Sequence, residues 1–396
     1  MNREDQFSVI ISLYSGNVYS STGVATVIKE LDQADWSSFG KIHTVFCLDE
    51  KEHYNEKIVV FETKSTKKRL SSIRKKLWAL SEKYSLIALL YLYFFHMYRA
   101  NKLINELCNK TEYRNHNYII HDLWSLICLA KENVNLEQCI FVNHGSVTPV
   151  KFIETIFPSL KGSLILSYAI ERKLKNILPK VKDVILLSEN RKTELISELG
   201  RDCKVIMNGM SDIVRHKMND NRSMTIHITG NICSRKRQYL IPYIASNLKK
   251  LTKHDFKINI FGGGELNKIK SVLNDLNINS HVELHGNVSN PSNYYFPGDI
   301  ILCISTEEGL PMALIEGIRS GCIPITVNVG GCKEVISNHN GFLLDSIDDE
   351  LLVEEVANKI AKITESDKMR MSLLSVELFK TKFSSEAMVR KYAEVF

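Results

Sequence analysis

Two glutamates separated by seven residues lie in a stretch that could bind a phosphorylated sugar. Glu308 and Glu316 flank a short loop and the start of an expected helix. The backbone N–H groups of Leu310, Met312 and Ala313 would then face a ligand, and helix N-termini favour anionic groups such as phosphate. Carboxylates beside that position can accept hydrogen bonds from sugar hydroxyls. The alternative is that Glu308 is a turn residue and Glu316 a solvated helix residue.

Three consecutive cations form a second candidate. Arg235, Lys236 and Arg237 come after the strand expected over Met224–Thr229 and before a helix expected over Gln238–Leu248. Cations at the carboxyl end of a strand, next to a helix N-terminus, can clamp a diphosphate. The alternative is a basic surface loop.

Two histidines follow expected strands in the first half of the chain. His121 comes after Tyr118-Ile-Ile, and His144 after Cys139-Ile-Phe-Val-Asn. Ligands bind at the carboxyl ends of strands in open α/β sheets, so a histidine there is better placed for chemistry than one in a core. Most single histidines are structural, and we rank His144 before His121.

The elements that must position these residues alternate between strands and helices. Asp299–Ile304 is an unbroken apolar run typical of a parallel strand buried on both faces. Gly309 permits the turn that follows, Pro311 suits the first helical position, and Gly321 should end the helix. The order is therefore strand, loop, helix.

The chain opens in a similar way. Phe7–Tyr14 is an apolar strand, and a loop of small residues containing Gly23 precedes the helical run Val24–Leu31. A strand, a glycine loop and a helix typically begin a Rossmann-like domain. Gly23 either lets the backbone approach a diphosphate or only permits a tight turn.

The composition indicates a two-domain globular protein. The chain has 396 residues, of which 44% are hydrophobic and 24% charged. Nine cysteines without a Cys-x-x-Cys pair predict reduced core thiols in a cytoplasmic protein rather than zinc or disulfides. From the polar start, Met1–Gln6, no signal peptide is expected. A net charge of +6 does not by itself indicate a nucleic-acid partner.

A basic segment leads into an aromatic run. Seven bases and no acid lie between Lys64 and Lys76, and the run Leu86–Tyr98 follows Trp78. The run is too short for a transmembrane helix, which needs about twenty apolar residues. Two interpretations stay open: a buried helix, or contact of Lys64–Tyr98 with an anionic membrane surface. An acceptor carried on a lipid would explain the second.

These motifs together resemble a known signature. Glu308–Gly317 is followed by Ser-Gly-Cys-Ile-Pro-Ile at Ser320 and by Gly-Gly-Cys-Lys-Glu at Gly330. This order resembles the C-terminal signature of GT-B glycosyltransferases, most closely family 4 (group 1), which transfers sugars from nucleotide donors with retention. The resemblance implies an α/β fold with two Rossmann-like domains facing each other across a cleft. It predicts an acceptor-side domain over 1–205, a nucleotide-sugar domain over 206–380, and a closing helix over 381–396 that crosses back.

The resemblance also implies residue roles. Glu308 and His144 would contact the transferred sugar, Glu316 the ribose, and Lys236 the diphosphate. The family's arginine is replaced by Asn231, and Arg235 could supply that charge. The donor-binding set implied by the family comprises Gly23, Arg235, Lys236, Asn287, Val288, Leu310, Met312, Ala313 and Glu316, of which Asn287 and Val288 would meet the nucleobase.

The predicted activity is transfer of a sugar to a glycan or lipid-linked acceptor in bacterial surface polysaccharide synthesis, such as O-antigen or capsule. The chain contains no Asp-x-Asp, so no metal is expected. No cofactor is expected beyond the donor, with a UDP-sugar ranked before a GDP-sugar. Two other functions stay open: a nucleotide-sugar epimerase of the same fold, and a non-catalytic scaffold that binds the nucleotide sugar. The location expected is cytoplasmic, with the inner face of the plasma membrane as the surface for peripheral contact.

Overall fold

The computed structural model describes residues 8–18, 22–49, 58–62, 69–110, 113, 116–218, 223–337 and 339–396. The chain divides into two units. Unit 1 comprises residues 1–207 and 388–396, and unit 2 comprises residues 208–387. Unit 1 ends at residue 207, two residues after the predicted boundary at 205. Residues 381–387, which were predicted to belong to the closing helix, are part of unit 2. Of the predicted basic segment, Lys64, Lys67 and Lys68 lie outside the described residues.

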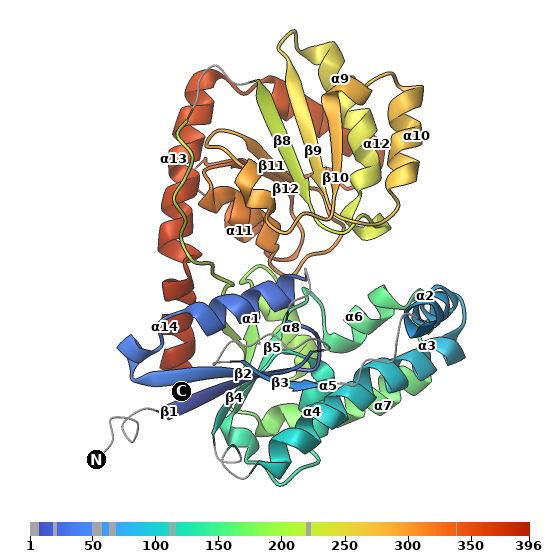
Figure 1. Cartoon of the computed structure of the whole chain (residues 1–396), viewed down its shortest axis with the longest axis vertical. Coiled ribbons are helices and arrows are strands. Elements are labelled where there is room, and N and C mark those ends of the chain that lie inside the picture. Colours follow the sequence, from blue (N-terminus) through green and yellow to red (C-terminus); the bar gives the residue numbers. More distant parts are fainter. Residues whose placement is uncertain are drawn as a thin grey trace. The chain divides into compact units, whose positions relative to one another are not determined.

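Unit 1 is built on a parallel sheet (Figure 1). Its strands are β1 (Ser8–Tyr14), β2 (Lys41–Asp49), β3 (Ile58–Glu62), β4 (Asn117–Ile120), β5 (Cys139–Asn143), β6 (Asp183–Leu186) and β7 (Lys204–Val205). The spatial order is β3-β2-β1-β4-β5-β6-β7. Its helices are α1 (Gly23–Gln33), α2 (Arg69–Ser81), α3 (Ser85–Tyr91), the π-helix η3 (Leu92–Met97), α4 (Tyr98–Asn109), α5 (Leu123–Leu129), α6 (Pro149–Ile156), α7 (Leu164–Ile177) and α8 (Lys192–Leu199). The last helix, α14 (Ser385–Val395), contributes its residues from Met388 onward to this unit.

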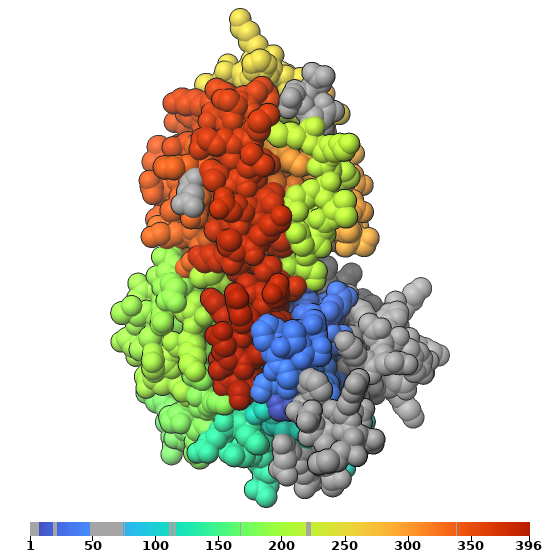
Figure 2. Space-filling model, turned by 90° about the vertical axis from the view of Figure 1, so that its left-hand side faces the viewer, coloured from blue at the N-terminus to red at the C-terminus, as the bar shows by residue number. Residues whose placement is uncertain are grey.

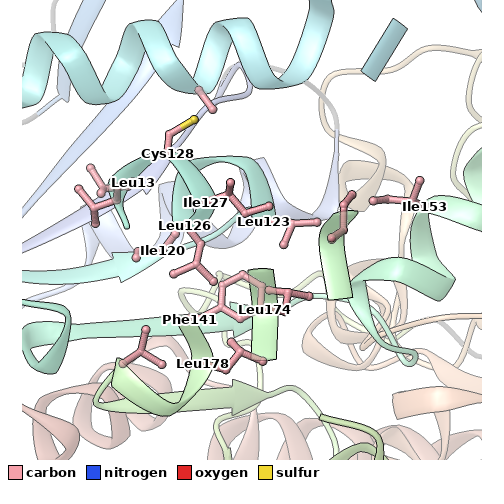
Figure 3. Packing of buried hydrophobic residues seen from close by; sticks show 14 of the residues in the cluster. Leu13, Ile120, Leu123, Leu126, Ile127, Cys128, Phe141, Ile153, Leu174 and Leu178 are labelled. Carbon is pink, nitrogen blue, oxygen red and sulfur yellow. The ribbon is translucent and has the colours of Figure 1, made fainter. Parts of the chain in front are cut away.

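The sheet forms because its strands are apolar on both faces. β5 is buried along its whole length, as expected for a parallel strand covered by helices. Figure 3 shows Leu126 from α5 and Leu174 from α7 near Phe141 of β5, in the same cluster as Leu13 and Ile120 from neighbouring strands. This core holds the strand ends, and the histidines that follow them, in fixed positions.

Unit 2 carries a second parallel sheet. Its strands are β8 (Met224–Thr229), β9 (Phe256–Phe261), β10 (Val282–Gly286), β11 (Ile300–Cys303), β12 (Ile323–Val327) and β13 (Phe342–Leu344), in the order β10-β9-β8-β11-β12-β13. Its helices are η8 (Ser234–Lys236), η9 (Gln238–Leu240), α9 (Ile241–Leu251), α10 (Leu266–Asp275), α11 (Met312–Arg319), η12 (Gly330–Val335), α12 (Asp349–Ala361) and α13 (Glu365–Lys382). The strand order changes direction between β8 and β11. This is the position where open α/β sheets bind ligands.

The linker that enters unit 2 runs beside α13. Figure 2 shows residues 211–218 in yellow-green next to this orange-red helix. The guanidinium of Arg215 lies 5.9 Å from the ring centre of Phe379 on α13, and its Nε donates to the carbonyl of Arg319. Where the chain leaves the unit, Met210 N–H donates to the carbonyl of Phe383, and Ser385 N–H to the carbonyl of Met210. The entering and leaving segments are therefore bonded to each other.

Candidate active site

Glu308 is buried in the loop that joins β11 to α11. The loop packs against a second glycine turn, because Gly331 N–H donates to the carbonyl of Gly309 at 2.6 Å. A Cβ on Gly331 would lie 2.3 Å from that carbonyl oxygen, so only glycine fits. α11 begins at Met312, with Pro311 as its cap residue. The prediction of Pro311 as the first helical residue was wrong by one position, since its ψ of 113° is extended.

Two cations from the loop after β8 meet the Glu308 carboxylate. Lys236 Nζ donates to Glu308 Oε1, and Arg235 Nη1 lies 3.4 Å from the same oxygen. Arg235 Nη1 also donates to the carbonyl of Glu307 at 2.6 Å, and Thr306 N–H donates to the carbonyl of Arg235 at 2.8 Å. The Lys236 and Glu308 side chains are only 17% and 9% exposed. The structure thus brings together Arg235, Lys236 and Glu308, which the sequence predicted to contact the donor sugar and its diphosphate.

The Lys236 ammonium keeps its charge in this position. Burial by itself would lower its pKa, but the Glu308 carboxylate attracts the charged form, and the net effect raises the pKa of Lys236. Its side chain lies over Gly230, which has a φ of +140°. A Cβ on the neighbouring Gly262 would lie 2.0 Å from the carbonyl oxygen of Gly230. Glycines therefore let the two strand-end loops stack beneath the lysine.

Arg237 does not join this cluster, although the sequence placed three cations in one clamp. It has a left-handed φ of 54°, which turns its side chain toward α12. Its Nη2 donates to the carbonyl of Ile347 at 2.9 Å, and its Nε lies 3.4 Å from Asp349 Oδ1. Arg237 therefore has a structural role.

The remaining predicted donor-binding residues of unit 2 surround the same strand ends. Glu316 lies half-buried on α11, Leu310 and Met312 are buried, and Ala313 is partly exposed. Asn287 and Val288 follow β10. The amide of Asn287 packs so closely on Gly263 that a Cβ there would lie 2.8 Å from its nitrogen. Asn231, which stands where the family has an arginine, is exposed, and its backbone carbonyl accepts from Gln238 Nε2 at 3.1 Å.

Thiols lie beside the cation cluster. Cys303 ends β11, and a hydrogen bond from the buried Cys332 thiol lowers the pKa of Cys303 to about 7. The same bond raises the pKa of Cys332. Cys233, two residues before Arg235, is exposed, so the prediction that all cysteines lie in the core was wrong at this position.

The predicted His144 belongs to a chain of hydrogen bonds across the sheet of unit 1. His144 Nε2 and His121 Nδ1 are 3.0 Å apart, and the two rings are stacked. His121 Nε2 lies 3.1 Å from Ser12 Oγ, which lies 2.9 Å from His43 Nε2. The four residues come from or follow β5, β4, β1 and β2, which are consecutive in the sheet. Sequence analysis missed Ser12 and His43, because nothing in a local pattern links four strands.

Burial keeps these imidazoles neutral. It lowers the pKa of His144 to about 4, and burial together with the neighbouring histidines lowers that of His121 well below its usual value. A neutral imidazole can donate from one nitrogen and accept at the other, so proton positions along the chain are linked. His144 can therefore orient a sugar hydroxyl by a hydrogen bond.

Unit 2 contains a similar chain. Asp299 Oδ2 lies 3.0 Å from His227 Nε2, Asn259 Nδ2 lies 3.4 Å from His227 Nδ1, and Asn259 Oδ1 lies 3.0 Å from His285 Nε2. These residues follow the strand order β11-β8-β9-β10. Each sheet therefore has a buried polar connection over four neighbouring strands.

Gly23 is the first residue of α1 and is exposed. Thr22 caps this helix, with its side chain accepting from Ala25 N–H at 3.3 Å. Residues 19–21 of the loop lie outside the described residues. The backbone of Gly23 is thus at a helix N-terminus, as a diphosphate contact would need.

A cavity of about 670 Å³ opens beside His121 and His144 in unit 1. Its lining includes Arg74, one of the seven bases of the predicted basic segment, and also Arg99 and His96, which sequence analysis did not single out. Within the part of the chain that the structure describes, no group of three or more His, Cys, Asp or Glu side chains could hold a metal ion.

Known proteins resemble this chain in both sequence and fold. The family model described as glycosyl transferases group 1 matches residues 214–374. The O-antigen biosynthesis glycosyltransferase WbnH of Escherichia coli is 25% identical over 217 residues, which cover 54% of this chain and 58% of that protein. The chain thus spans less than two thirds of this relative's length.

Solved structures extend the likeness of fold to nearly the whole chain. Sucrose-phosphate synthase from Thermosynechococcus elongatus has a TM-score of 0.72 at 14% identity, covering 98% of each chain. HepE of Anabaena, solved with UDP and glucose, has a TM-score of 0.60 at 14% identity and the same coverage. The chain therefore has the GT-B fold of two Rossmann-like domains, and residues 214–374 of its second unit are similar to the glycosyl transferases group 1 family.

Proposed function

We propose that this protein is a retaining glycosyltransferase that moves a sugar from a nucleotide diphosphate to a glycan or lipid-linked acceptor. The observation that carries the proposal is the cluster of Lys236, Arg235 and the buried Glu308 at the strand ends of β8 and β11. The cluster faces the start of α11, where free N–H groups favour an anion. The match of residues 214–374 to the group 1 family supports the same activity.

The cluster explains how a donor would be used. Without a ligand, the Glu308 carboxylate balances both cations. A donor diphosphate would take over Lys236 and Arg235, which would stabilise the charge that builds up on the leaving nucleotide. Glu308 would then accept hydrogen bonds from the transferred sugar, Glu316 would hold the ribose, and His144 would contact the sugar. Arg235 supplies the charge that Asn231 lacks.

We infer that the reaction needs no divalent metal, because two protein cations already serve the leaving diphosphate. Activity should persist in EDTA and should not rise on addition of magnesium. Loss of activity in EDTA with recovery in magnesium would overturn this inference. Retention is tested separately, by the anomeric configuration of the product in an NMR spectrum.

The donor we favour is a UDP-sugar, as the HepE structure with UDP and glucose suggests for this fold. The role we favour is surface polysaccharide synthesis, in line with the O-antigen assignment of WbnH. A lipid-linked acceptor would place the enzyme at the inner face of the plasma membrane.

One surface of unit 1 supports membrane contact. The helices α3, η3 and the start of α4 expose large apolar side chains, namely Leu86, Leu90, Tyr93, Phe94 and Tyr98. The buried-helix interpretation of this run was thus half right, since Ala88, Tyr91 and Leu92 are buried. Among the described residues, no helix is long and apolar enough to cross a membrane.

Flotation with vesicles containing anionic phospholipid tests this contact. Replacing Leu86, Tyr93 and Phe94 with serine should abolish flotation, and reversing Lys67, Lys68, Lys75 and Lys76 to glutamate should do the same. Leu373→Ser, which changes an equally exposed side chain on α13, is the control and should float normally. Unchanged flotation of both the serine variant and the glutamate variant would show that this segment does not bind the membrane.

A thermal-shift screen with UDP-, GDP- and ADP-sugars tests the proposed function. A donor at a hundred times its dissociation constant should stabilise the protein by about 2.7 kcal/mol. Glu316→Ala and Lys236→Met should lose the shift. Slow hydrolysis of the bound donor would favour an enzyme, whereas tight binding of unchanged donor would favour the scaffold, and a changed sugar on the same nucleotide would favour the epimerase.

A further inference from the structure

The lining of the cavity in unit 1 contains two kinds of side chain. The aromatic ones, called here the aromatic wall, include Trp78, Phe95, Trp124, Phe141, Phe152 and Phe157. The polar ones, called here the polar wall, include Arg74, Arg99, His121 and His144. A volume of about 670 Å³ is within the range of sites for small organic ligands. The walls together suit a molecule with an apolar chain and an anionic end.

A π-helix builds part of this cavity. The segment η3 interrupts the helical run between α3 and α4, and Leu92, Phe95, His96 and Arg99 from this region line the cavity. Single π-helical turns are rare and often occur at functional sites. The wider turn presents an aromatic ring, an imidazole and a guanidinium to one space.

Arg74 is positioned by contacts in unit 1. Arg74 Nε donates to the Tyr91 hydroxyl at 3.2 Å, and its guanidinium lies 5.5 Å from the ring centre of Phe95. Burial, Arg74 and Arg99 together lower the pKa of His96 to about 4. The fields of both guanidiniums therefore reach the same imidazole, which stays neutral.

Among the described residues, one acid lines the cavity, and its carboxylate already accepts hydrogen bonds from the protein. Asp122 caps α5 by accepting from Ser125 N–H at 2.9 Å and from Ser125 Oγ at 2.7 Å. It also accepts from Ser15 N–H at 2.8 Å and Ser15 Oγ at 3.0 Å. With four hydrogen bonds on Asp122 and two arginines in the lining, the polar wall favours an anion.

We propose that this cavity binds a phosphate ester of an apolar alcohol, with the phosphate at Arg74 and Arg99 and the chain along the aromatic wall. Arginine suits this role because its planar fork donates two hydrogen bonds to one phosphate. That this ester belongs to the glycosyl acceptor rests on the function proposed above. The binding itself does not depend on that function.

Intrinsic fluorescence gives a direct test, because Trp78 and Trp124 line the cavity. The full chain, without any nucleotide, is titrated with farnesyl phosphate, farnesol and glucose 1-phosphate. Farnesyl phosphate should bind saturably, and the other two at least 10-fold more weakly. Arg74→Gln and Arg99→Gln should each weaken farnesyl phosphate binding by about 10-fold or more and leave farnesol binding unchanged.

Arg172→Gln is the matched control, since Arg172 is an exposed arginine of the same unit whose guanidinium contacts Tyr168. Equal affinity for farnesol and farnesyl phosphate, or an equal loss in Arg172→Gln, would overturn the phosphate site. Equal affinity for glucose 1-phosphate would overturn the role of the aromatic wall. The thermal shift caused by a nucleotide sugar, and its loss in Lys236→Met, tests only the donor site in unit 2. The proposed function and the phosphate ester site in unit 1 can therefore be disproved independently.

Discussion

Lys236 and Arg237 are adjacent in sequence but make contacts in different places. Lys236 bonds the Glu308 carboxylate, whereas Arg237 bonds the start of α12. Lys236→Met should lower kcat/KM by about 10²–10³-fold, the usual cost of removing one donor to a developing charge. Arg237→Gln removes a cation one position away and should change kcat/KM by less than about 10-fold. Equal losses in the two variants would contradict the assignment.

Cys233 provides a reporter for the donor site. Cys233 is exposed and lies two residues before Arg235, while Cys108 in α4 is partly buried and the other seven cysteines are buried. A bound nucleotide sugar should slow alkylation of Cys233 by N-ethylmaleimide, because the diphosphate would cover the adjacent loop. Mass spectrometry after timed labelling measures the rate, and Cys108 in the same sample is the internal control. A donor that stabilises the protein but leaves Cys233 labelling unchanged would place the diphosphate elsewhere.

The residues that could be predicted from the sequence are those fixed by local pattern. Lys236 and Glu308 were found because each follows an apolar strand, and strand ends gather at one edge of a sheet. The different direction of Arg237 was not predictable, because it depends on a left-handed φ at one residue. The link from His144 to His43 was also missed, since Ser12 and His121 are 109 residues apart.

At the scale of elements, α11 depends on its close contact with β11. A Cβ on Gly317 would lie 2.5 Å from Ile301 Cγ2. Gly317→Ala should therefore push the helix away from the strand, destabilise the protein by about 1–3 kcal/mol, and weaken nucleotide binding. Urea unfolding and the thermal shift with donor measure the two effects.

Replacing Ile301 of β11 with a smaller residue gives the control for this prediction. Ile301→Ala makes room for the added methyl, so the double variant should be more stable than the sum of the two single changes predicts. Strict additivity would show that the helix and the strand do not compete for this space.

The order of elements was largely predictable, because unbroken apolar runs such as 299–304 indicate buried parallel strands. Gly321 also ends α11 as predicted, with a φ of +85°. The π-helix was not predictable. Its sequence, Leu-Tyr-Phe-Phe-His-Met, is compatible with an ordinary helix, and the wider turn arises in the packed structure around the cavity.

At the scale of the whole molecule, the buried histidines predict acid sensitivity in unit 1. The pKa values of His96 and His144 are lowered to about 4, and that of His121 is also lowered. Between about pH 6.5 and pH 4 the unfolded chain therefore binds more protons than the folded one. The stability that these neutral histidines contribute is fully present above about pH 6.5. Below it, the free energy of unfolding should fall by about 1.4 kcal/mol per pH unit for each such histidine.

Urea unfolding followed by tryptophan fluorescence measures this loss in unit 1, because all three tryptophans lie there. The midpoint should decrease from pH 7 to pH 4.5. His144→Gln and His96→Gln should each flatten that decrease. A midpoint that does not depend on pH in this range would show that these histidines are charged in the folded protein.

Side-chain hydrogen bonds cross four neighbouring strands in each sheet and oppose the separation of any one strand. If one of the strands β2, β1, β4 and β5 separates, its neighbour keeps a buried polar atom without a partner, at a cost of about 1–3 kcal/mol. Partial separation is thus unfavourable compared with loss of all four strands. The same holds for β11, β8, β9 and β10. Amide hydrogens in each set of four strands should therefore exchange with solvent at a common rate, through one cooperative opening per unit.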